Sequence, residues 1–199
     1  KKEGIWQLGE EAAAAANGQE PGDIKVQDVD GNGVITTDDR IIYSQRPDVT
    51  FGFNNTFNYK GFDLSVFLYA RLGQWIAYDY NTTYRINALE NGGNVDYWTP
   101  ENPTNAFPRP NKSKSYTQVT YYSTLKYEDG SFFKIRDITL GYTFKPELLK
   151  HLNLSRLRVY ATAKNFFTFS KIDNYDPEQG GSISFPMTKQ LVFGLNVEF

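Results

Sequence analysis

The last nine residues of the chain alternate between apolar and mostly polar side chains. The apolar set is Leu191, Phe193, Leu195, Val197 and Phe199. The intervening set is Val192, Gly194, Asn196 and Glu198. Because successive side chains of a strand point to opposite faces, the segment predicts a strand with one apolar face. Such a strand ending on an aromatic residue is typical of a transmembrane β-barrel, whose lipid and lumen faces alternate.

The composition excludes several other classes of protein. A formal net charge of -2 over 199 residues gives no electrostatic footprint for nucleic acid, so nucleic-acid binding is not expected. Cysteine is absent, which rules out disulfides and thiolate metal sites. No apolar run approaches the roughly 20 residues of a spanning helix, so insertion into a membrane requires strands. The first residues have no apolar core of a secretory signal, so we expect either a processed or an internal start.

Turn signals divide most of the chain into five expected strands, at residues 49–59, 62–72, 132–144, 156–169 and 189–199. Lys60-Gly61 and residues 146–153 are short connections, whereas residues 73–131 and 170–188 are long ones. Short periplasmic turns that alternate with long extracellular loops are typical of bacterial barrels. The expected fold class is therefore all-β and antiparallel. Five strands cannot close a barrel, and an open edge is not tolerated in hydrocarbon, so further strands are expected elsewhere.

Alternation also assigns faces to these strands. Phe67 falls on the lumen face of the second strand as an apolar exception. In the third strand, Lys134 and Arg136 share the parity of the lipid-facing residues. We expect their charges to reach the headgroups, because they lie on the extracellular side of that strand. Residues 1–48 are expected to form an extracellular loop region, and residues 49–199 the strands with their long loops.

Residues 28–39 match the spacing of an EF-hand calcium loop. Oxygen donors fall at its positions 1, 3, 5, 7 and 12, namely Asp28, Asp30, Asn32, the Val34 carbonyl and Asp39. Gly33 supplies the sharp turn at position 6. Asp39 departs from the template, in which the twelfth residue is usually Glu. The shorter Asp side chain reaches the ion less easily. The pattern predicts one structural calcium ion. The alternative is an Asx- and glycine-rich turn without metal.

An enzymatic function is not expected. His151 is the only histidine, and it follows a predicted helical turn at Pro146 as a surface residue without a partnered nucleophile. The acidic pairs are adjacent in sequence, and nothing places two carboxylates across a cleft as glycoside hydrolysis requires.

The aromatic residues of the first long loop are candidate contacts for substrate or partner, because long loops on rigid scaffolds often carry binding. They are Trp75, Tyr78, Tyr80 and Trp98. The alternative is that loop aromatics such as Trp98 only anchor an ordered loop. A different fold also remains open, a soluble calcium-containing β-sandwich that binds glycans through these side chains or Tyr97.

A series of short motifs resembles the C-terminal part of SusC/RagA-type TonB-dependent outer-membrane transporters. In chain order they are Pro21-Gly22-Asp23-Ile24-Lys25, the Asp-Gly-Asn-Gly loop at 30–33, Pro47-Asp48-Val49-Thr50-Phe51-Gly52-Phe53, Tyr59-Lys60-Gly61-Phe62-Asp63-Leu64-Ser65, Trp98-Thr99-Pro100-Glu101-Asn102-Pro103-Thr104-Asn105, Asp129-Gly130-Ser131-Phe132-Phe133-Lys134-Ile135-Arg136, Ile138-Thr139-Leu140-Gly141-Tyr142 and Tyr175-Asp176-Pro177-Glu178. The resemblance covers essentially the whole chain, and the ordered set is far more specific than any one motif.

The resemblance implies the last five strands of a barrel of about 22 strands in the outer membrane of a Gram-negative bacterium. It also implies a set of partners: the remainder of the barrel with its plug, outer-membrane lipid, a SusD-like surface lipoprotein, and the TonB complex, which acts through an N-terminal part absent from this chain. The implied activity is TonB-dependent import of oligosaccharides or peptides. On this resemblance, Phe199 is expected to belong to the signal read by the barrel-assembly machinery.

Overall fold

A computed structural model describes residues 1–84, 92–114 and 118–199. The strands are β1 (Lys2–Ile5), β2 (Ile24–Val26), β3 (Val49–Tyr59), β4 (Phe62–Leu72), β5 (Trp75–Ala77), β6 (Tyr127–Asp129), β7 (Phe132–Thr143), β8 (Arg156–Ser170) and β9 (Gln190–Glu198). The helices are α1 (Glu11–Ala16) and α2 (Pro146–Leu149), with 3-10 turns η1 (Thr37–Asp39), η2 (Asp79–Thr83), η4 (Tyr122–Lys126), η5 (Lys150–Leu152) and η6 (Pro177–Gln179). None of the described helices is long and apolar enough to cross a membrane.

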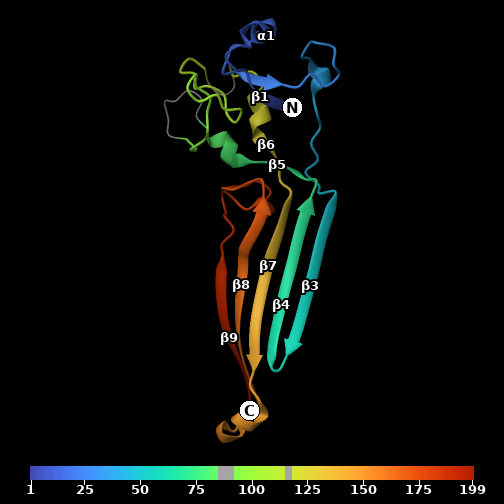
Figure 1. Ribbon diagram of the computed structural model, residues 1–199, viewed down its shortest axis with the longest axis vertical. Coiled ribbons are helices and arrows are strands. Elements are labelled where there is room, and N and C mark those ends of the chain that lie inside the picture. The colour runs from blue at the N-terminus through green and yellow to red at the C-terminus, as the bar shows by residue number, and fades with distance from the viewer. Residues whose placement is uncertain (85–91, 115–117) are drawn as a thin grey trace. The chain divides into compact units, whose positions relative to one another are not determined.

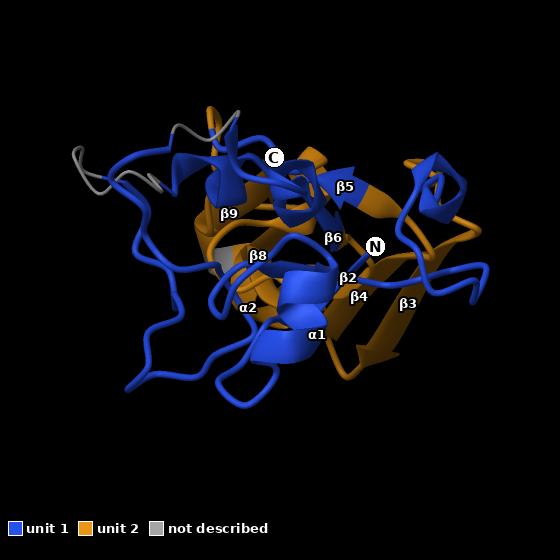
Figure 2. Cartoon of the chain, turned by 90° about the horizontal axis from the view of Figure 1, so that it is seen from above, with its two compact units in different colours: residues 1–43, 76–128, 181–183 blue, residues 44–75, 129–180, 184–199 orange. Residues whose placement is uncertain are grey.

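The described residues form two compact units, each built from several chain segments (Figure 2). Unit 1 comprises residues 1–43, 76–128 and 181–183, and unit 2 comprises residues 44–75, 129–180 and 184–199.

Unit 2 is built on a five-stranded antiparallel sheet in the order β3-β4-β7-β8-β9 (Figure 1). Each strand agrees with its predicted range to within one residue at either end. The five predicted strands are therefore confirmed. The signals that located them were alternation along each strand and the turn residues between them.

The β3–β4 connection is the tight hairpin that Lys60-Gly61 predicted. Both residues have positive φ, 48° for Lys60 and 90° for Gly61, as a type I′ turn requires. A Cβ on Gly61 would also lie 2.7 Å from the Thr143 carbonyl oxygen. The β7–β8 connection contains α2 and η5, as the helical turn at Pro146 predicted. The side chain of His151 lies outside the described part of the chain.

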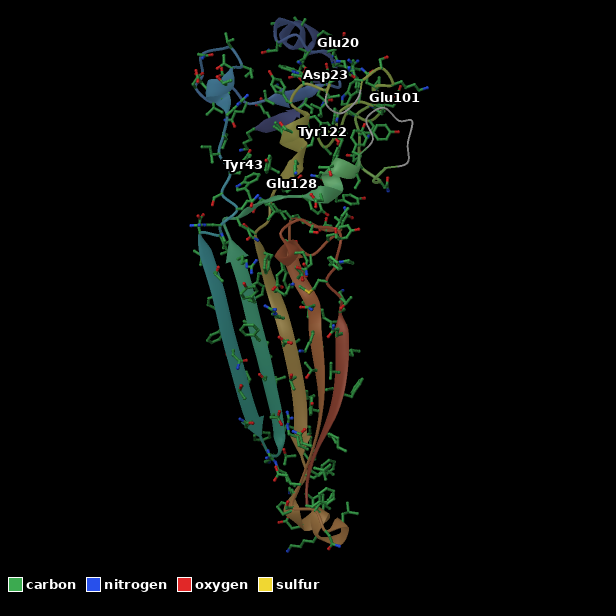
Figure 3. All side chains as sticks on the ribbon, turned by 180° about the vertical axis from the view of Figure 1, so that it is seen from behind. Glu20, Asp23, Tyr43, Glu101, Tyr122 and Glu128 are labelled. Carbon is green, nitrogen blue, oxygen red and sulfur yellow. The ribbon has the colours of Figure 1, made fainter. Side chains whose placement is uncertain are left out.

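One face of this sheet is apolar from edge to edge. A single row runs through Phe57, Leu64, Leu140, Ala161 and Phe193, one residue from each strand. Three of these side chains are strongly exposed, Phe57 at 60%, Leu140 at 51% and Phe193 at 78%. We call this side the apolar face. The opposite side, the polar face, includes Asn54, Thr56, Asp63, Ser65, Asp137, Thr139, Arg158 and Thr162. Figure 3 shows side chains projecting from both sides of the strands.

A β-bulge at Arg136 reverses the side-chain parity at the beginning of β7. Ile135 and Asp137 pair with adjacent residues of β4, so that Arg136 is an extra residue. Lys134 therefore lies opposite Tyr69 on the polar face, and the Arg136 guanidinium also reaches the Tyr69 ring, 5.4 Å from its centroid. The predicted lipid-side position of Lys134 and Arg136 was wrong, because one extra residue exchanges the two faces of a strand.

Unit 1 has a small apolar core of its own. Ile5 of β1, Ile24 of β2, Trp98 and Leu125 are buried together. The antiparallel pairing of β1 with β2 brings the first two of these residues side by side. Near β2, Arg109 forms ion pairs with Glu20 at 2.5 Å and Asp23 at 3.3 Å, and Figure 3 labels both acids. The strands β1, β2, β5 and β6 were not predicted, since three or four residues are too few to show alternation.

Candidate functional site

The predicted calcium loop folds around the Asp28 side chain. Its two carboxylate oxygens accept hydrogen bonds from the backbone N–H groups of Gly31 and Gly33, each at 2.7 Å. Gly31 and Gly33 have φ values of 74° and 82°, a region that favours glycine. The two glycines therefore allow the tight turns that bring these N–H groups to the Asp28 carboxylate.

Asp39 closes the loop from its far end. Its two carboxylate oxygens accept from the Val29 and Thr36 N–H groups, both at 2.7 Å, and Thr36 completes a capping box at η1. The side chain is buried, and the residue is 5% exposed. The backbone N–H groups of Thr36 and then Val29 lower the pKa of Asp39, so this carboxylate stays charged.

Three carboxylates converge inside this loop. One oxygen each from Asp28, Asp30 and Asp39 lies within 4.8 Å of the others. Asn32 donates from Nδ2 to Asp30 at 2.9 Å, and its Oδ1 accepts from the Val34 N–H at 2.8 Å. Calcium prefers hard oxygen ligands, and each carboxylate oxygen keeps a second lone pair beside the hydrogen bond that it accepts. The donor set fits the ion, while ligation by these residues stays a prediction.

The predicted contact aromatics lie in different environments. Tyr78 and Tyr80 lie together, with ring centroids 5.9 Å apart. Trp98 belongs to the core of unit 1, is 4% exposed, and donates from Nε1 to Gln7 at 2.8 Å. Trp75 begins β5 and belongs to unit 2. The burial of Trp98 agrees with the alternative that it anchors the loop, whereas contact with a substrate or partner stays a prediction for all four aromatics.

Sequence reasoning missed an ionic cluster on the polar face. Lys134 is fully buried, and its Nζ donates to Asp176 at 2.6 Å and to Glu178 at 2.7 Å. Arg136 also pairs with Glu178, at 3.0 Å. Asp176 caps η6, because its other oxygen accepts the Glu178 N–H. The cluster therefore ties the beginning of the β8–β9 connection to β7.

A second polar contact crosses three strands. Arg158 of β8 reaches Asp63 of β4 with two hydrogen bonds, of 2.9 and 2.5 Å. It passes over Gly141 of β7, where a Cβ would lie 2.5 Å from both charged groups. Gly141 thus makes room for a bidentate pair between strands that are not neighbours. The glycine inside a strand was the only sequence signal for it.

The comparisons with known proteins identify this architecture. No family model matches the chain. The TonB-dependent receptor P3 of Formosa agariphila is 31% identical over 98% of the chain, which spans 21% of that receptor. The TonB-dependent receptor SusC of Bacteroides thetaiotaomicron is 31% identical over 86% of the chain and 17% of its own length. A structure of the RagAB peptide transporter matches with a TM-score of 0.68 and 25% identity, over 89% of this chain and 21% of that one.

The chain is similar to a segment of SusC/RagA-type TonB-dependent receptors. It spans about a fifth of the length of the proteins it matches. The resemblance predicted from the motifs and the all-β barrel-segment fold are confirmed, and so is the absence of an enzymatic class, since the relatives are receptors and transporters. The alternative of a soluble β-sandwich was wrong, because the sheet matches a barrel segment and its apolar face is exposed.

Proposed function

We propose that this chain is part of an outer-membrane transporter of a Gram-negative bacterium that imports oligosaccharides or peptides by a TonB-dependent route. The observation that carries the proposal is the apolar face, which is continuous in register across β3, β4, β7, β8 and β9 and has exposed apolar side chains on each of these strands. A soluble monomer rarely exposes such a patch, whereas a lipid-facing barrel wall requires it.

The proposed partners follow from the same arrangement and from the relatives. The outer strands β3 and β9 each have one edge without a partner among the described residues, so further strands of the barrel must cover them. Two relatives are named TonB-dependent receptors, which supports the proposal that the TonB complex energises the full-length protein and that a plug domain belongs to it. RagAB is named as a peptide transporter, which supports oligomeric cargo. The SusD-like lipoprotein is proposed as a partner from the overall similarity to SusC and RagAB.

Disruption of the gene that encodes the full-length protein should abolish growth on one class of oligosaccharide or peptide and leave growth on free monosaccharides and amino acids unchanged. The measurement is growth and uptake of labelled oligomers by the disrupted strain, the complemented strain and a strain without functional TonB. The disrupted and TonB-deficient strains should lose the same uptake. Recovery of the full-length protein in the soluble fraction, or uptake that persists without TonB, would contradict the proposal.

We also propose that Asp28, Asp30, Asn32, the Val34 carbonyl and Asp39 bind one structural calcium ion. The convergence of three carboxylates in a loop wound around glycines supports it. Removal of calcium should release the loop for proteolysis. With calcium at about 100 times its dissociation constant, binding stabilises the loop by about 2.7 kcal/mol.

The substitution Asp30→Asn should weaken calcium binding in the full-length protein by about 10-fold or more, since it removes a charged ligand. Asp38→Asn is the matched control, because Asp38 lies in the same loop outside the three-carboxylate group. Calcium titration followed by protease cleavage within residues 28–39 is the measurement. Equal behaviour of the two variants, or a loop whose cleavage does not depend on calcium, would leave the metal-free turn as the correct description.

A further inference from the structure

Two arginine side chains meet one tyrosine on the polar face. The guanidinium carbons of Arg71 and Arg136 lie 5.5 and 5.4 Å from the centroid of the Tyr69 ring. Arg71 also donates from Nε to the Tyr69 hydroxyl at 2.8 Å. A cation over an aromatic face is attracted by the ring quadrupole, so Tyr69 holds both guanidinium groups in place.

The charges around this tyrosine do not balance. Lys134 binds Asp176 and Glu178, and Arg136 shares Glu178 with it. Arg71 has no carboxylate partner among the residues that the structure describes, and its hydrogen bond to Tyr69 uses only Nε. Three cations therefore face two carboxylates. The side chain of Arg136 is 40% exposed, so a guanidinium edge remains open for an anion.

Aromatic rings continue from the arginines along the same face. Phe67, the apolar residue that alternation placed on this side, lies opposite Asp137. Its ring is stacked with that of Tyr69, with centroids 6.4 Å apart and an interplanar angle of 26°. Both side chains are only partly buried. Phe67 and Tyr69 thus form a strip of two nearly parallel rings that ends at the two guanidinium groups.

We propose that Phe67, Tyr69, Arg71 and Arg136 form a subsite for an acidic oligosaccharide in the barrel lumen. The apolar face of a sugar ring would stack on the aromatic strip, and its carboxylate would bind the guanidinium groups, whose planar fork matches a carboxylate. The inference rests on the proposed transport function and names its cargo class. A peptide carboxylate is borne on a flexible chain without a flat apolar face beside it, so the aromatic strip favours the saccharide.

Binding of three probes to the purified full-length transporter tests the subsite. They are tetragalacturonate, its fully methyl-esterified form, and tetraglutamate. Tetragalacturonate should bind at least about 10-fold more tightly than its methyl ester, since each charged hydrogen bond is worth 10-fold or more. Arg71→Gln and Arg136→Gln should each remove about 10-fold of this affinity and weaken binding of the uncharged ester much less. Arg71→Lys keeps the positive charge but lacks the planar guanidinium, so it should give an intermediate affinity. This conservative variant keeps the test decisive if the glutamine variants do not fold.

Arg156→Gln is the matched control, because Arg156 lies on the same face at the opposite end of β8 and is 54% exposed. It should bind all three probes as the parent protein does. Equal affinity for tetragalacturonate and its ester, no measurable binding of either, or no effect of the arginine variants would overturn the subsite. Tighter binding of tetraglutamate than of tetragalacturonate would overturn the assignment to a saccharide. If uptake depends on TonB but the arginines have no effect, the transport proposal stands and only this inference fails.

Discussion

Replacing Lys134 with methionine should destabilise the full-length protein by about 3–5 kcal/mol, the usual cost of removing one partner of a buried ion pair. The Lys134 side chain is fully buried, and Asp176 and Glu178 are only 12% and 9% exposed. Without the lysine, Asp176 has no ion-pair partner among the described residues, and of its two cationic partners there Glu178 keeps Arg136. The measurement is denaturant unfolding of the folded barrel, combined with protease cleavage in residues 170–180, where the connection should become accessible.

Lys171→Met is the matched control for this prediction. Lys171 pairs with Asp129 at 2.9 Å, but its side chain is 80% exposed, so its loss should cost at most about 1 kcal/mol. Combining Lys134→Met with Asp176→Asn and Glu178→Gln should recover part of the stability, because no buried charge is then left unpaired. If the two lysine variants unfold alike, the buried cluster does not hold the connection.

The sequence predicted those features that depend on neighbours along the chain. The hairpin at Lys60-Gly61 depends on two adjacent residues, of which Gly61 favours positive φ, and each long strand has its own alternation. The convergence of Asp28, Asp30 and Asp39 followed from spacing within twelve residues. Features of this kind need no knowledge of which distant segments meet.

The polar-face cluster could not be predicted in this way. Lys134 and Asp176 are 42 positions apart, and the residues around either one do not indicate that the two side chains meet. The bulge at Arg136 makes this ion pair possible, because it places Lys134 on the polar face, where Asp176 lies. A local signal was present, since Arg136 and Asp137 are two successive charged residues in a strand that otherwise alternates. Such a break in alternation indicates a bulge, and a bulge at Arg136 places the residues before it on the opposite face from the one that strict alternation predicts.

The substitution Phe193→Arg should destabilise the assembled barrel by about 2–4 kcal/mol, the cost of an arginine on the lipid face near the bilayer midplane. Phe193 lies near the middle of β9, pairs with Ala161, and is 78% exposed on the apolar face. Its neighbour Val192 is the matched control, because it pairs with Thr162 and projects from the polar face of the same strand. Val192→Arg introduces the same charge one position away, where water solvates it.

The two arginine variants separate a membrane barrel from any fold in which both faces of β9 are solvated. Phe193→Arg should lower the amount of folded protein in the outer membrane and its midpoint of urea unfolding, whereas Val192→Arg should remain close to the parent protein in both measurements. A sheet that faced water on both sides would tolerate an exposed arginine equally well at either position, since surface substitutions usually change stability by less than about 0.5 kcal/mol. Equal stability of the two variants would therefore contradict the lipid-facing assignment of the apolar face. Only contact with lipid makes an arginine destabilising on one face of this nine-residue strand and harmless on the other.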